Sequence, residues 1–133
     1  MNERIFETTI KVRDYETDSQ GIVNNANYLH YLEITRHDFC EYAGTSFRAM
    51  QEAGLDPVVR RIEIDYISSL TLGDVMRSAL SMKRHGARFI FEQDIYNATT
   101  GAHVVHALVT VVCLEHGRIS RGDMLAEAFA EYL

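Results

Sequence analysis

The sequence predicts an α+β domain in which an antiparallel sheet of about five strands wraps around one long central helix. Three observations lead to this prediction. Residues 27–43 have helical spacing with apolar groups around much of the circumference, which favours a buried helix. The segments on either side alternate in polarity or are rich in β-branched and aromatic residues. Short turns join the last of these segments, so we expect neighbouring strands to pair antiparallel.

The first strand is expected at residues 6–12, where apolar residues and threonine occupy the even positions and charged residues most of the odd ones. The long helix follows and ends at Gly44, because glycine readily adopts the conformation that closes a helix. A second, short helix is expected at residues 46–54. A meander of about four strands then covers 62–66, 76–82, 87–96 and 103–115, and a terminal helix is possible at 124–133.

No repeat, low-complexity tract or linker interrupts the chain, so residues 1–133 are interpreted as a single domain. The only proline, Pro57, is expected in a loop that enters a strand.

The composition restricts the partners and the location. The net charge is −6, which disfavours a nucleic-acid partner because a phosphate backbone attracts basic proteins. The two cysteines, Cys40 and Cys113, fall in apolar stretches and are predicted to be buried and reduced. The chain shows neither the apolar core of a signal peptide nor a stretch of roughly 20 apolar residues. These features favour a soluble, cytoplasmic protein without membrane contact.

The polar stretch before the long helix contains Asp18, Gly21 and three asparagines, Asn24, Asn25 and Asn27. Taken alone, asparagines in this position are helix caps, and an aspartate is most often a turn residue. The pattern is more specific when it is combined with the tyrosine-rich helix and the strands that follow.

The order Asp18, Gly21, Val23, Asn25, Tyr28 resembles the motif of hotdog-fold acyl-CoA thioesterases of the 4-hydroxybenzoyl-CoA thioesterase type. The resemblance extends weakly over most of the chain. It implies a hotdog fold, in which the sheet curls around the helix, and a homodimer whose sheets join edge to edge, with homotetramers common. It also implies an active site at the subunit interface and no cofactor.

Hydrolysis of a thioester needs an activated water or a nucleophile, an oxyanion site and a slot for the acyl chain. Asp18 can act as a general base or as a nucleophile, and the sequence does not choose between them. Backbone amides at the helix start can stabilise the oxyanion, and the resemblance assigns this role to the Asn25 amide. Gly21 allows a tight turn and a close approach to the substrate.

The chain departs from the family pattern at two positions. Ile22 stands where many fatty-acyl relatives carry histidine, and Asn25 stands where other subgroups carry it. Glu16 lies two residues before Asp18, so on an extended segment both carboxylates would face the same way. Glu16 can equally lie in solvent or pair with an arginine.

Substrate contacts are predicted in two regions. Tyr28, Tyr31 and Leu32 are candidate walls of the acyl slot or simply core residues. Basic side chains are candidates for binding the phosphates of coenzyme A or of a carrier protein, although solvated surface positions explain each one equally well. They are Arg60, Arg61, Lys83, Arg84 and Arg88.

No metal site is predicted. His30, Glu33 and His37 share a helix face, but the two histidines are about 10 Å apart along the axis, so a polar face explains them better. His103 and His106 lie on a predicted strand and, three residues apart, are expected to point to opposite faces.

We therefore interpret the sequence as a hydrolase that cleaves an acyl-CoA thioester to the free acid and CoA. The alternatives are an acyl carrier protein (ACP) thioesterase and a non-catalytic protein of the same fold that binds acyl thioesters.

Overall fold

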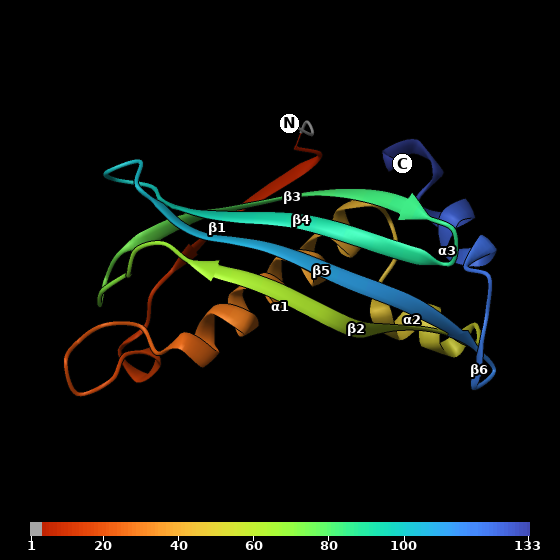
Figure 1. Cartoon of the computed structure of the whole chain (residues 1–133), viewed down its shortest axis with the longest axis horizontal. Helices are drawn as coiled ribbons and strands as arrows, with labels where there is room; N and C mark the ends of the chain where they lie inside the picture. The colour runs from red at the N-terminus through yellow and green to blue at the C-terminus, as the bar shows by residue number, and fades with distance from the viewer. Residues whose placement is uncertain (1–3) are drawn as a thin grey trace.

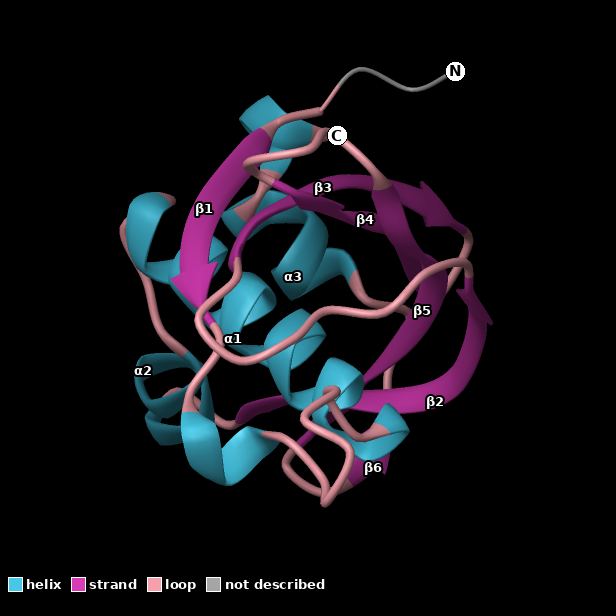
Figure 2. Cartoon of the chain, turned by 90° about the vertical axis from the view of Figure 1, so that its left-hand side faces the viewer, coloured by secondary structure: helices cyan, strands magenta, loops and turns pink. Residues whose placement is uncertain are grey.

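A curved antiparallel sheet surrounds one long helix, α1 (Asn25–Tyr42), which confirms the predicted α+β class and the hotdog fold (Figure 1 and Figure 2). The structure is a computed structural model and describes residues 4–133. The strands are β1 (Phe6–Lys11), β2 (Leu55–Tyr66), β3 (Val75–His85), β4 (Arg88–Asn97), β5 (His103–Glu115) and the short β6 (Arg118–Ile119). The remaining helices are η1 (Asp14–Glu16), α2 (Phe47–Glu52), α3 (Asp123–Ala128) and η2 (Ala130–Tyr132).

The strand order corrects the predicted meander. The sheet runs β1-β3-β4-β5-β2, so β2 pairs with β5 and lies at an edge instead of beside β3. Of the four strands in the predicted meander, β3, β4 and β5 are consecutive neighbours, and the short β6 then pairs with β5. Pro57 also differs from the prediction, because it lies inside β2. An edge strand tolerates proline, since one side of its backbone needs no partner within the sheet.

Helix α1 begins two residues before the predicted start. Asn24 is its N-cap, and the side-chain oxygen of Asn24 accepts a hydrogen bond from the Ala26 N–H at 2.9 Å. The helix lies within the curve of the sheet, as Figure 2 shows, and its buried residues include Tyr31, Leu32 and Phe39. No helix within residues 4–133 has both the length and the apolar character needed to cross a bilayer.

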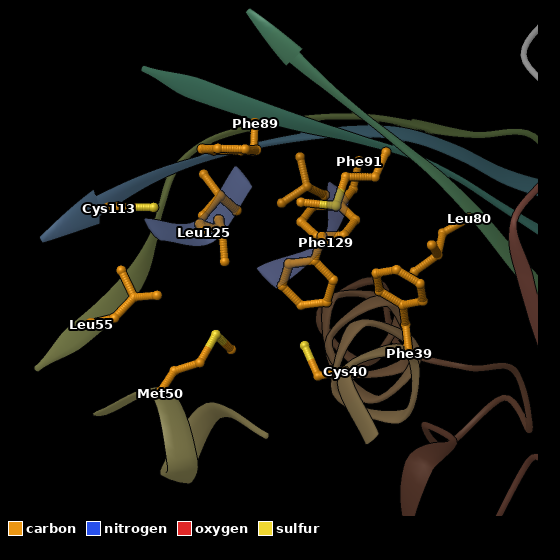
Figure 3. Packing of buried hydrophobic residues seen from close by; sticks show 13 residues of the cluster. Phe39, Cys40, Met50, Leu55, Leu80, Phe89, Phe91, Cys113, Leu125 and Phe129 are labelled. Atoms are coloured by element: carbon orange, nitrogen blue, oxygen red, sulfur yellow. The ribbon is translucent and has the colours of Figure 1, made fainter. Parts of the chain in front are cut away.

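The core divides into two clusters along α1. The cluster in Figure 3 centres on Phe39, whose ring lies 5.4 Å from that of Phe129 and 5.2 Å from that of Tyr132. The other cluster, toward the start of the helix, includes Tyr28 and Tyr31. The two clusters fix the helix along its length, so its first turn has a defined position at one end of the sheet.

A bulge in β5 changes which side chains share a face. The β4–β5 pairing shifts by one residue, since Ile95 pairs with Val105 but Tyr96 pairs with His103. Val104 is therefore an extra residue, and Val104 and Val105 are both fully buried. As a result His103 and His106 lie on the same outer face of the sheet, so the prediction that they point to opposite faces is wrong.

Candidate active site

A short hairpin loop, residues 17–23, carries Asp18 and leads directly into the N-cap of α1. Thr17 and Val23 form a β-bridge, and the Asp18 N–H donates to the Ile22 carbonyl at 2.9 Å. The turn is closed by the Gly21 N–H, which donates to the Asp18 carbonyl at 3.0 Å. Gly21 has a φ of +78°, a conformation that favours glycine, so the sequence-based role of Gly21 as a turn residue fits the structure.

The loop is anchored to the segment between β2 and β3. The Val23 N–H donates to the Leu70 carbonyl at 2.9 Å, and Ile22 forms a bridge with Thr71. Val23 is 2% exposed and belongs to the core. The loop therefore has a fixed base, and its tip projects from the body of the protein.

The Asp18 side chain is exposed in the single chain. Its Oδ1 accepts a hydrogen bond from the Gln20 N–H at 2.8 Å, which is the Asx-turn arrangement typical of aspartate in loops. No ion pair involving Asp18 occurs within residues 4–133. The carboxylate is thus held in place by the loop and keeps one oxygen for other contacts.

The first turn of α1 presents a backbone donor beside this loop. The Ala26 N–H is bound by the Asn24 side chain, and the Asn27 N–H donates to the Asn24 carbonyl at 2.9 Å. The Asn25 N–H has no acceptor among residues 4–133. An unpaired amide at the positive end of a helix dipole suits an anion, so the geometry is compatible with an oxyanion contact at Asn25.

Glu16 supports the loop and does not act as a second free carboxylate. It lies in η1, so it is not on the extended segment that the sequence suggested. Its Oε1 accepts hydrogen bonds from the Arg13 N–H at 2.7 Å and from the Tyr31 hydroxyl at 3.0 Å. The sequence left open whether the Glu16 carboxylate lies in solvent or pairs with an arginine side chain. Instead it binds the Tyr31 hydroxyl on α1. Burial, assisted by this hydrogen bond to Glu16, raises the pKa of Tyr31.

The three residues considered as acyl-slot walls are core residues in the single chain. Tyr28, Tyr31 and Leu32 are at most 2% exposed. The Tyr28 hydroxyl accepts the Leu70 N–H at 3.0 Å, and burial raises the pKa of Tyr28. In the single chain these three side chains are therefore core residues, which is one of the two interpretations that the sequence allowed.

Three of the five predicted phosphate-binding residues line one groove. Arg60, Arg61 and Arg88 surround a groove of about 460 Å³ on the outer face of the sheet. Glu63 also lines it and pairs with Arg61 at 3.2 Å. The groove is basic overall, with three guanidinium groups against one carboxylate.

The other two predicted phosphate-binding residues, Lys83 and Arg84, point to different sides of β3. The strand register places Lys83 in a row with Ile90, Thr110 and Arg61, so Lys83 shares the outer face of the basic groove. Arg84 points the other way and donates to Asp123 Oδ1 at 2.6 Å and to the Arg121 carbonyl at 2.9 Å. Arg84 thus ties β3 to the C-terminal segment and lies apart from the basic groove, and its role in phosphate binding stays a prediction.

The structure also contains a cavity that the sequence did not indicate. About 260 Å³ lies between α1 and β2, lined in part by Arg36, Phe47 and Val59. Arg36 is 6% exposed, and its Nη1 donates to Gln93 Oε1 at 3.0 Å. No ion pair of Arg36 occurs within residues 4–133, and burial lowers its pKa. The cavity was missed because its walls come from segments far apart in the sequence.

The helix face with His30, Glu33 and His37 lines a groove of about 310 Å³ together with Ile34 and Asp38. His37 Nε2 lies 3.6 Å from Glu33 Oε1, the distance of an i,i+4 pair on a helix surface. Within residues 4–133, three metal-ligating side chains converge elsewhere, at Asp94, His103 and His106.

Both cysteines are free and buried, as predicted. Burial raises the pKa of Cys40 to about 12 and that of Cys113 to about 11. At pH 8 the thiolate fraction is then on the order of 10⁻⁴ and 10⁻³, so neither thiol is an effective nucleophile. We expect the native protein to show no fast reaction with 5,5′-dithiobis(2-nitrobenzoate) and to release two equivalents only in denaturant. Rapid labelling of the native chain would contradict this.

Comparison with known proteins agrees with the fold. The family model described as the thioesterase-like superfamily matches residues 12–131. Long-chain acyl-CoA thioesterase FadM of Escherichia coli is 36% identical over 111 residues, which cover 83% of each chain. The acyl-acyl carrier protein thioesterase ATL3 of Arabidopsis thaliana is 30% identical over 112 residues, 83% of this chain, and the chain spans 58% of the ATL3 sequence.

A solved structure gives the same result. The structure of YbaW, a probable thioesterase from Escherichia coli, superposes with a TM-score of 0.83 at 32% identity, and the match covers 95% of this chain and 97% of YbaW. The match of the family model over most of the chain, together with this likeness, shows that the chain belongs to the thioesterase-like superfamily.

Proposed function

We propose that the chain hydrolyses acyl-CoA thioesters, with Asp18 and the Asn25 amide as the reacting and stabilising groups. One observation carries this proposal: an exposed carboxylate lies on a hairpin loop that leads into the helix, and the helix starts with an N–H that has no acceptor in residues 4–133. The names of FadM and YbaW support the reaction class, since both are described as thioesterases, FadM of long-chain acyl-CoA.

The reaction follows from these groups. Asp18 accepts a proton from water, whose oxygen attacks the thioester carbon, or Asp18 attacks that carbon itself and water cleaves the resulting anhydride. The carbonyl oxygen becomes negative in either case, and the Asn25 N–H stabilises this charge. The carbon–sulfur bond then breaks, and the CoA thiolate leaves and takes up a proton.

A second copy of the chain is part of this proposal. Strand β2 has twelve residues and pairs only on its β5 side within residues 4–133. Val58, Val59, Ile62 and Tyr66 on this strand are 36–46% exposed. A long apolar edge favours pairing with another strand, so we propose that two copies join along β2 about a two-fold axis.

Such a dimer explains how an exposed Asp18 meets an acyl slot. Arg36 lines the cavity between α1 and β2. It comes eleven residues after Asn25, which is about 16 Å further along the helix, so this cavity is remote from the helix start of the same chain. In antiparallel pairing of two β2 strands, the two helices also run antiparallel. The helix start of one copy then approaches the cavity of the other, which is our proposed acyl slot.

The basic groove is the proposed site for the CoA phosphates. We expect the double variant Arg60→Ala, Arg88→Ala to raise KM for acyl-CoA about 10-fold, with kcat within about 2-fold, because phosphate contacts bind ground and transition state alike. Steady-state kinetics at low salt measures both constants. Arg48→Ala is the control, since Arg48 is exposed and its one ion pair among the described residues, 4–133, is with Glu52 on α2. An unchanged KM in the double variant would remove the groove from the proposal.

An ACP thioester is the second candidate substrate. ATL3 is described as an acyl-acyl carrier protein thioesterase, and the basic groove fits an acidic partner. The discriminating experiment measures thiol release from a panel of acyl-CoAs and the matching acyl-ACPs. The proposal expects turnover of at least one acyl-CoA by the wild-type chain and turnover slower by about 10³-fold in Asp18→Asn. Binding without thiol release across the panel would favour the non-catalytic alternative.

A further inference from the structure

Three metal-ligating side chains meet on the outer face of the sheet, away from the proposed active site. His103 Nε2 and His106 Nδ1 each lie 2.8 Å from Asp94 Oδ1, and the three ligand atoms are within 4.8 Å of one another. Asp94 comes from β4 and the histidines from β5. The bulge at Val104 creates this arrangement, because without it the two histidines would lie on opposite faces.

We propose that Asp94, His103 and His106 bind one divalent transition-metal ion, with Zn²⁺ as the best match. Two imidazole nitrogens and one carboxylate oxygen form a ligand set that Zn²⁺ accepts, with water as the fourth ligand. Tetrahedral ligands on zinc are about 3.3 Å apart, so zinc binding requires each imidazole nitrogen to move roughly 0.5 Å away from Asp94 Oδ1 and the two ring nitrogens, now within 4.8 Å, to lie about 3.3 Å from each other. Both histidines are partly exposed, which leaves room for this movement and for a water.

The groups around the three ligands are those that metal sites use to orient them. Histidine ligands usually direct the second ring nitrogen toward a carboxylate. Here His106 Nε2 lies 3.9 Å from Glu92 Oε2. The ring of His103 stacks on that of Tyr96, with centroids 4.8 Å apart and planes at 19°. Both rings are thus oriented before any ion arrives.

The charges are compatible with a divalent ion. Asp94 is 1% exposed, and its Oδ2 is bound by the Arg4 guanidinium, which also pairs with Glu92 at 3.3 Å. Arg4 therefore occupies the oxygen opposite the histidines and leaves Oδ1 to them. The carboxylates of Asp94 and Glu92 and the guanidinium of Arg4 together give a local charge of −1. A neutral imidazole that binds the metal carries its ring proton on the other nitrogen, which in His106 is the Nε2 that faces Glu92.

Zinc binding to tag-free protein, stripped of metal by chelation, tests the proposal. Isothermal titration with ZnCl₂ is expected to give one ion per chain, and Co²⁺ to give the visible absorption of a tetrahedral complex. Zn²⁺ at 100-fold excess over Kd should raise Tm on the order of 5–10 °C, because it binds only the folded state. This readout is independent of thioester turnover.

Variants locate the ion. His103→Gln and His106→Gln should each weaken Zn²⁺ binding by roughly 100-fold or more, and Glu92→Gln by roughly 10-fold, as expected for direct and supporting groups. His37→Gln, on the exposed helix pair, is the control and should bind like wild type. Circular dichroism of the metal-free variants verifies folding. No binding by the wild type, or equal binding by His103→Gln and His106→Gln, would show that the cluster is only a hydrogen-bonded network.

Discussion

Asp18→Asn is expected to lower kcat for acyl-CoA hydrolysis about 10³-fold, within the range of general acid–base catalysis, while substrate binding stays near the wild-type level. The amide oxygen of asparagine can still accept the Gln20 N–H, so the loop conformation is preserved. An amide neither takes the proton of water nor attacks the carbon. Thiol release under saturating substrate measures kcat, and competition with a non-hydrolysable thioether analogue measures binding.

The chain offers a matched control for this variant. Asp14 is exposed, and its Oδ1 accepts the N–H of the next residue, Tyr15, at 2.8 Å, whereas Asp18 accepts the N–H of Gln20 two residues on, also at 2.8 Å. Asp14→Asn should retain full turnover. If both variants are equally active, Asp18 is only a turn residue, which is the simpler interpretation of its sequence position.

Phe39→Ala is expected to lower the free energy of unfolding by about 3–5 kcal/mol, as for large aromatic residues in closed cores. Phe39 is fully buried beside Phe91 and Phe129, as Figure 3 shows. Its ring centroid lies within 6.4 Å of those of Phe6, Phe91, Phe129 and Tyr132. The cavity left behind would separate α1 from both the sheet and the C-terminal segment. Urea unfolding at a fixed protein concentration measures the loss.

Tyr42→Ala is the control for this core. Tyr42 lies one turn further along α1 and contacts Phe6 and Tyr132, but it is 64% exposed. Its loss should cost about 1 kcal/mol or less, since little apolar area leaves water. A loss below about 1 kcal/mol for Phe39→Ala as well would mean that this cluster does not hold the fold together.

Local patterns predicted most of the elements. The period of α1 and the alternation in β1 follow from which residues must face the core, so both were found close to their observed bounds. Because Asn24 is the N-cap, the helix begins at Asn25, two residues before the predicted start. The pairing of β2 with β5 was missed because turn signals describe neighbours in sequence, whereas this contact joins distant segments. Pro57 was expected in a loop for the same reason, since a proline fits inside β2 because β2 is an edge strand.

The site was predictable only where it is continuous in sequence. The turn at Gly21 and the unpaired Asn25 amide belong to one short stretch, where the residue type indicated the turn and the resemblance to the thioesterase motif indicated the amide. The role of Glu16 depends on Tyr31, two helical turns into α1, and the grouping of Arg60 with Arg88 depends on strand register. A single inserted residue, Val104, reversed the prediction for His103. Alternation counts residues and does not detect a bulge.

The central claim is that the Asp18 carboxylate and the Asn25 amide act on the same thioester. A crystal structure of the Asp18→Asn variant with an intact acyl-CoA tests this most directly. The account predicts the thioester carbon within about 3–3.5 Å of the side chain at position 18, or one water away, and the carbonyl oxygen about 3 Å from the Asn25 nitrogen. A thioester bound elsewhere, such as in the groove beside His30 and Ile34, with position 18 in open solvent, would contradict it.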